Sequence, residues 1–106
     1  MELMSASEAL HQVTLAKNEI LNQQTEEISK TVVDLIKEMV SAGETYAIFR
    51  ARKEYKKEAF IRVGEILREK GYYYNLLYDD YEDKHLITKM EISWASKNPF
   101  PQMVKR

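Results

Sequence analysis

The feature that most constrains the fold is a stretch from Ser7 to Val40 that nothing in the sequence forces to leave a helix. It contains neither proline nor glycine, a serine stands at its start, and Gly43 follows its end, as is typical of helix boundaries. An unbroken helix of this span is roughly 50 Å long, whereas a compact globule of this chain length is only about 30–35 Å across. Either the helix breaks, or half of it projects and is buried by something else, most simply another copy of the chain.

The two halves of this stretch differ in their hydrophobic pattern. Apolar residues of the second half share one helix face, which favours packing on a sheet; they are Ile28, Val32, Leu35, Ile36 and Met39. The first half carries a thinner stripe, which consists of Leu10, Val13, Ile20 and Leu21. A thin stripe favours a seam between two helices over a globular core. We therefore predict one helix over 7–40 that forms a homo-oligomer, with a break at the polar residues 22–25 as the alternative.

The remainder of the chain predicts a small sheet and a second helix. A run of β-formers at 45–51 indicates a strand, helical spacing returns over 53–70, and Gly71 follows it. Residues 72–78 and 86–94 predict an antiparallel hairpin, because a short polar segment joins them. A right-handed crossover between the first two strands allows the third strand to insert between them, antiparallel to both.

The expected fold is α+β with the order α-β-α-β-β. We expect one domain over 1–94, in which helices cover one face of a three-stranded sheet, and a flexible C-terminal arm over 95–106. Cysteine is absent, which excludes disulfides and thiolate metal sites. The start shows no signal-peptide pattern, and no apolar run approaches the length of a membrane span. We therefore expect a cytoplasmic protein that makes no membrane contact.

The strongest local signal for a ligand is the basic run at residues 49–57. One acidic residue, Glu54, stands there among five cations: Arg50, Arg52, Lys53, Lys56 and Lys57. The formal net charge of the whole chain is −1, so the positive excess is local to the predicted junction of strand and helix. Helix starts offer free N–H groups, and arginine pairs with phosphate through parallel hydrogen bonds. The run predicts a site for a small phosphorylated ligand; surface lysines of a solvated helix start are the alternative.

Tyrosines supply a second signal. Tyr72, Tyr73 and Tyr74 are consecutive, so a strand divides them between its two faces and leaves at least one ring on the face that is not buried. An exposed ring beside a basic patch can stack on a nucleobase; the alternative is that tyrosine is simply a good strand residue. The predicted ligand-binding residues are therefore Arg50, Arg52, Lys53, Lys56, Tyr73 and Tyr74.

No pattern in the chain indicates catalysis, a metal site or a cofactor. The two histidines, His11 and His85, belong to no metal-binding or nucleophile motif. The acidic run of Asp79, Asp80, Glu82 and Asp83 lacks the glycine and glutamate spacing of a calcium loop. It predicts a solvated turn, or an acidic patch that meets a basic patch on another subunit. We predict that the protein is not an enzyme.

Three short motifs resemble a type of small phage or prophage protein. The first is a small residue followed by Glu-Ala and then Thr, at Ser7, Glu8, Ala9 and Thr14. The others are Lys-Gly-Tyr at 70–72 and Ile-Ser-Trp at 92–94. This chain departs from the type in having Leu10 where a basic residue is expected. The resemblance implies a phage origin and no enzyme activity.

The expected architecture is also similar to that of phage anti-defence sponges, which sequester the nucleotide signals of bacterial immunity. This similarity implies a non-catalytic protein of the host bacterial cytoplasm that binds a small phosphorylated, for example cyclic, nucleotide. Fold alone does not establish function, so two other hypotheses stand beside it. One is a phage accessory or inhibitor protein that binds a host protein through the acidic turn and the arm. The other is weak nucleic-acid binding, which the near-neutral net charge disfavours.

Overall fold

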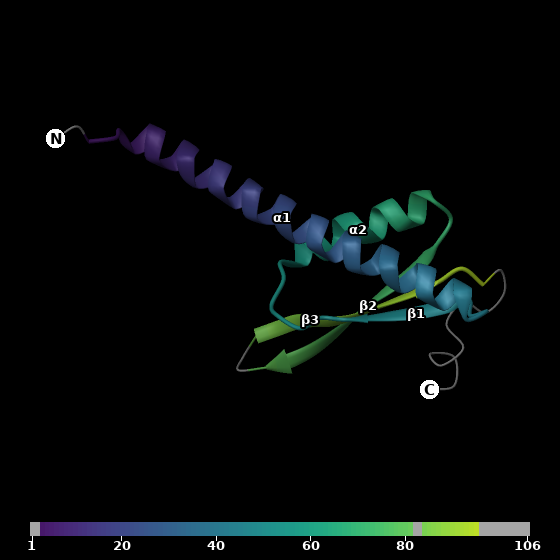
Figure 1. Cartoon of the computed structure of the whole chain (residues 1–106). Coiled ribbons are helices and arrows are strands. Elements are labelled where there is room, and N and C mark those ends of the chain that lie inside the picture. Colours follow the sequence, from purple (N-terminus) through teal and green to yellow (C-terminus); the bar gives the residue numbers. More distant parts are fainter. Residues whose placement is uncertain (1–2, 82–83, 96–106) are drawn as a thin grey trace.

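The computed structural model describes residues 3–81 and 84–95. Its elements follow the order α-β-α-β-β and are α1 (Ala6–Ser41), β1 (Tyr46–Arg50), α2 (Lys57–Glu69), β2 (Tyr73–Tyr81) and β3 (Lys84–Ser93). The three strands form one antiparallel sheet in the order β1-β3-β2, and both helices lie on the same side of it (Figure 1). The predicted α+β class, the element order and the central position of β3 are confirmed.

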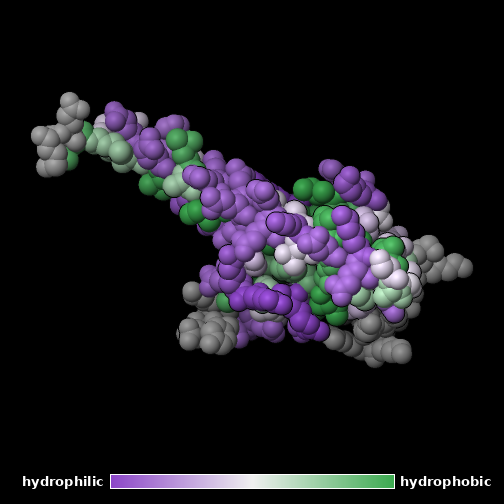
Figure 2. All heavy atoms as spheres, viewed as in Figure 1, coloured by the Kyte–Doolittle hydropathy of each residue, from purple (hydrophilic) through white to green (hydrophobic). Residues whose placement is uncertain are grey.

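Helix α1 is continuous, and the alternative of a break at 22–25 does not occur. Ser5 begins it by accepting a hydrogen bond from the N–H of Glu8 at 3.1 Å, and Gly43 follows its end with a φ of 79°. The molecule measures 62 × 30 × 21 Å, because the first half of α1 extends away from the sheet (Figures 1 and 2). Residues 3–20 are all exposed, and burial begins at Leu21.

The core lies between the two helices and one face of the sheet. Sheet register places Met90 of β3 between Phe49 of β1 and Leu76 of β2, so that these side chains share the face toward the helices. The helices contribute the buried residues Ile28, Val32, Ile36, Ala59, Phe60, Val63 and Leu67. Each large apolar side chain stabilises the fold by about 1.5–3 kcal/mol when fully buried, which holds the second half of α1 on the sheet.

The second helix begins later than the predicted position 53. Residues 51–56 form a connection instead, here called the β1–α2 loop. Tyr55 and Lys53 of this loop reach back to Glu27 on α1, and those contacts hold the loop out of helical conformation.

The hairpin strands run further into the acidic run than predicted. Asp79 and Asp80 belong to β2, and the hydroxyl of Thr88 donates to Asp79 at 2.6 Å. The predicted arm from residue 96 onward, and Glu82 and Asp83 of the acidic run, lie outside the described residues. In the described part of the chain, no helix is both long and apolar enough to cross a membrane.

Candidate functional site

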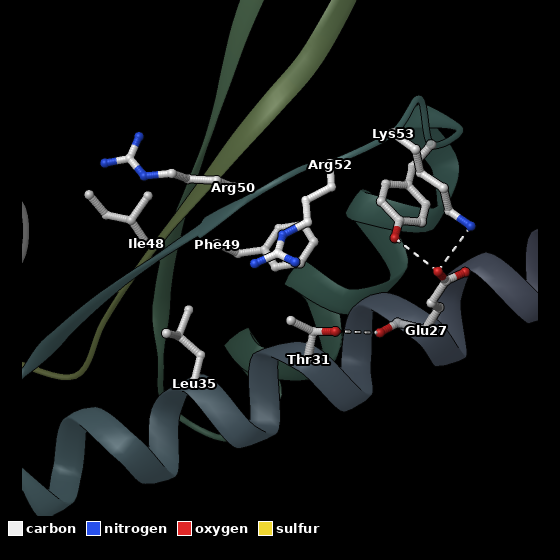
Figure 3. A pocket seen from close by; sticks show the side chains of 9 residues that line it. Glu27, Thr31, Leu35, Ile48, Phe49, Arg50, Arg52 and Lys53 are labelled. Atoms are coloured by element: carbon white, nitrogen blue, oxygen red, sulfur yellow. Dashed lines mark hydrogen bonds and ion pairs between the residues drawn. The ribbon is translucent and has the colours of Figure 1, made fainter.

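An open cleft of about 660 Å³ lies between the second half of α1 and the edge strand β1. We call it the β1 cleft. Three segments line it: Glu27, Thr31 and Leu35 of α1, Ile48, Phe49 and Arg50 of β1, and Arg52, Lys53 and Tyr55 of the β1–α2 loop (Figure 3). Three of the predicted ligand-binding cations therefore come together at one place.

Two arginines line the cleft from different sides of β1. Arg52 extends from the loop into the space between β1 and α1, toward Thr31, whereas Arg50 extends from the other side of β1, beside Ile48 (Figure 3). Among the described residues, neither guanidinium forms an ion pair or a hydrogen bond with another side chain. Both are exposed, so both can pair with an anion from solution.

The third cation of the cleft, Lys53, is already paired. Its ammonium lies 2.9 Å from Glu27 Oε1, and the hydroxyl of Tyr55 donates to the same oxygen at 3.2 Å. The hydrogen bond from Lys53 lowers the pKa of Glu27, and the same bond raises the pKa of Lys53. Both groups are therefore ionised at neutral pH. One carboxylate against three cations leaves the lining with a surplus of positive charge, which resides on the arginines.

Tyr55 is the aromatic residue of the site that the sequence analysis missed. Its ring packs edge-on against Phe60 with centroids 5.7 Å apart, and the Lys53 ammonium lies 5.3 Å from its centroid. Burial, followed by the charge of Glu27, raises its pKa. The helix predicted over 53–70 included this residue, so it was not considered as part of a site. Its position within the basic run is the signal that could have linked it to the arginines.

The predicted tyrosines lie at the opposite edge of the sheet. Tyr74 faces the helices, and its ring atoms lie 2.5 Å from where a Cβ on Gly64 would stand; it is therefore packing against α2. Tyr73 faces away from the helices and is 49% exposed. Both line a second hollow at the β2 edge, and β3 separates that edge from β1. The structure does not bring these tyrosines together with the arginines in one chain.

Lys56 and the start of α2 also lie apart from the cleft lining. Lys56 precedes α2 as its N-cap residue, and its backbone N–H donates to Gln24 Oε1 at 2.7 Å. The ammonium of Lys57 lies 6.0 Å from the ring centroid of Tyr78. The start of α2 therefore does not bring its free N–H groups to the described lining of the cleft, and the positive charge of that lining is carried by side chains.

The lining of the β1 cleft combines charged, aromatic and apolar side chains. Its aliphatic hydroxyl, on Thr31, donates to the backbone oxygen of Glu27 at 3.1 Å, so it is engaged within α1. No group of three metal-ligating side chains occurs among the described residues. What the lining offers a ligand is two guanidinium groups, one phenol ring and the apolar side chains of Leu35, Ile48 and Phe49.

Comparison with protein-family models, with curated proteins and with solved structures gave no match. A small α+β fold on its own does not specify an activity. The function is accordingly inferred from the chemistry of the β1 cleft.

Proposed function

We propose that the protein binds a small phosphorylated ligand in the β1 cleft and releases it unchanged. The observation that carries the proposal is the pair of arginines, Arg50 and Arg52, which line one cleft from opposite sides of β1 (Figure 3) and have no ion-pair partner in the described part of the chain. A guanidinium presents planar, paired donors that match phosphate geometry. The Lys53–Glu27 pair beside them leaves this positive charge uncompensated.

A nucleotide is the phosphorylated ligand that best fits the rest of the lining. Tyr55 offers an aromatic ring on which a base can stack, and Leu35 and Ile48 offer apolar contact. The volume of about 660 Å³ falls within the roughly 300–1,000 Å³ of small-molecule sites. The most specific form of the proposal is sequestration of a nucleotide immune signal on behalf of a phage. The sequence motifs that resemble phage proteins support that form.

The ligand can be identified by native mass spectrometry of protein purified from cells with an active nucleotide-signalling defence. We expect a reproducible added mass of a few hundred daltons, on the order expected for a nucleotide filling such a site. Heating the complex should release the ligand with its mass unchanged. A ligand recovered in altered form would identify an enzyme instead, and binding only to long nucleic acids with steep salt dependence would also contradict the proposal.

Charge reversal at Arg52 is expected to weaken ligand binding at least about tenfold. A hydrogen bond to a charged group contributes roughly 1.5–3 kcal/mol, and about 1.4 kcal/mol corresponds to a factor of ten in Kd. Isothermal titration calorimetry with the identified nucleotide would compare Arg52→Glu with Lys30→Glu. Lys30 is an exposed cation of α1 outside the cleft lining, so its reversal makes the same change in net charge. Equal losses for the two variants would show that Arg52 makes no specific contact.

A further inference from the structure

The first half of α1 has an apolar side that the described chain leaves uncovered. Leu10, Val13 and Ile20 are 69%, 48% and 44% exposed. Positions on this side follow one another at spacings of four and three residues, which is the repeat of a coiled-coil seam; they are Ala6, Leu10, Val13, Lys17 and Ile20. We call these five residues the α1 seam. Hydrophobic side chains are visible along this projecting part in Figure 2.

We propose that the α1 seam packs antiparallel against the α1 seam of a second copy of the chain. The projecting part, residues 6–20, is about as short as a helix that is only marginal on its own in water, so a partner helix would stabilise it. A twofold axis requires a patch that complements itself. The seam meets this requirement when two copies lie antiparallel, because Leu10 of each copy can then face Ile20 of the other, with the axis level with Leu15.

The charge pattern around the seam favours a second copy over a charged partner. The positions that flank a coiled-coil seam and usually carry charge are neutral here: Ser7, Thr14 and Leu21 on one side, Ala9, Ala16 and Gln23 on the other. Two such surfaces meet without opposing like charges. A strongly charged protein or a nucleic acid would find one cation here, Lys17, and little else to pair with.

The chain's own β1–α2 loop determines the direction of the partner. Gln24 is the next position of the seam after Ile20, and its side chain accepts the N–H of Lys56 at 2.7 Å, so the loop covers the seam from there on. Two parallel helices would run side by side past Gln24, where both loops stand in the way. In an antiparallel pair, the partner's α1 begins at its own Ala6, next to this loop. It therefore fits along the seam between the β1–α2 loop and the N-terminal end of α1.

The same contact sets the register of the pair. If Ala6 lies beside the partner's Gln24, then Leu10 lies beside the partner's Ile20 and Val13 beside the partner's Lys17. Leu10 of each copy therefore makes a hydrophobic contact with Ile20 of the other, and the two contacts lie on opposite sides of the twofold axis. The aliphatic part of Lys17 covers Val13 while its ammonium reaches water.

Cysteine cross-linking tests the register, because the chain contains no cysteine of its own. An oxidised mixture of the Leu10→Cys and Ile20→Cys variants should give a disulfide-linked dimer. Leu10→Cys alone should not, because its two copies would stand about 15 Å apart along the helices, beyond the roughly 7 Å reach of a disulfide between Cα atoms. Efficient cross-linking of Leu10→Cys alone would indicate parallel helices and would overturn the proposal.

Sedimentation equilibrium tests the dimer itself. The double variant Leu10→Glu/Ile20→Glu opposes like charges in the antiparallel register and should raise the Kd of the dimer at least about a hundredfold. Leu10→Lys/Ile20→Glu loses the same hydrophobic contacts but opposes unlike charges, so its Kd should rise less than that of the double-Glu variant. Leu15→Glu is the matched control, because Leu15 is 49% exposed on the other side of the helix. Circular dichroism would verify that each variant remains folded. A monomeric wild type at micromolar concentration, or an unaffected double-Glu variant, would refute the proposal.

Discussion

Replacing Phe60 with alanine is expected to lower the free energy of unfolding by about 3–5 kcal/mol. Phe60 is fully buried where α2 meets the sheet, and its ring packs edge-on against Phe49 and Tyr55 at centroid distances of 6.0 and 5.7 Å. Truncation leaves a cavity that these rings cannot refill without moving. Because domains of this size have a total stability of about 5–15 kcal/mol, the variant is expected to be close to unfolding at 37 °C.

Urea denaturation would measure this loss, and Ile61→Ala is the matched control. Ile61 is the next residue of α2 and is 37% exposed, so its truncation is expected to cost about 1 kcal/mol or less. The Phe60 variant also removes a support of Tyr55 in the β1 cleft, so we expect weaker ligand binding even where the protein remains folded. Similar losses for the two variants would contradict the position of Phe60 at the centre of the core.

Replacing Tyr46 with phenylalanine is expected to lower the free energy of unfolding by roughly 1.5–3 kcal/mol at neutral pH. Tyr46 lies on the face of the sheet that points away from the helices, next to Glu91, which is only 4% exposed. The Tyr46 hydroxyl donates to Glu91 Oε2 at 2.9 Å, while Oε1 has no hydrogen-bond partner in the described part of the chain. The substitution therefore removes the one hydrogen bond that the buried Glu91 carboxyl group receives from the described part of the chain.

The contribution of Tyr46 is expected to disappear at high pH. Burial, together with the hydrogen bond to Glu91, raises the pKa of Tyr46 from 10.0 to about 12. Because the folded state holds this proton more tightly than the unfolded chain, the associated stability is complete below pH 10 and is lost as the pH rises toward 12. The difference in unfolding free energy between the wild type and Tyr46→Phe should therefore shrink over that range.

Urea titrations between pH 8 and pH 12 would test this dependence. Tyr73→Phe makes the same chemical change on the same face of the sheet, at a ring that is 49% exposed, and is expected to have little effect at any pH. A constant difference between the wild type and Tyr46→Phe up to pH 12 would argue that the hydroxyl of Tyr46 does not interact with Glu91.

Local sequence patterns were sufficient to predict which elements form. The apolar period over residues 28–39 and the alternation over 86–94 depend on residues only a few positions apart, and they correspond to the packed half of α1 and to β3. The continuity of α1 follows from the absence of proline and glycine over 7–40. The predicted start of α2 was wrong, because Lys53 and Tyr55 are held by Glu27. Glu27 is distant from them in the sequence and close in the fold.

The candidate site was predictable only in part, for the same reason. Arg50, Arg52 and Lys53 were found together because they are neighbours in the chain. Tyr73 and Tyr74 lie at the edge of the sheet opposite the arginines because the strand order is β1-β3-β2. This order was expected, but the predicted site still joined the tyrosines to the arginines.

The sequence by itself determined the α+β class, the long helix with the thin apolar stripe on its first half, and the position of the basic run. Only the tertiary structure decided which cations remain unpaired. Packing of α1 over β1 brings Glu27 to Lys53 at 2.9 Å, which neutralises that lysine, leaves Arg50 and Arg52 without an ion-pair partner among the described residues, and adds Tyr55 to the cleft. These contacts join residues far apart in the chain, and their distances depend on how the helices pack on the sheet, which no local pattern specifies.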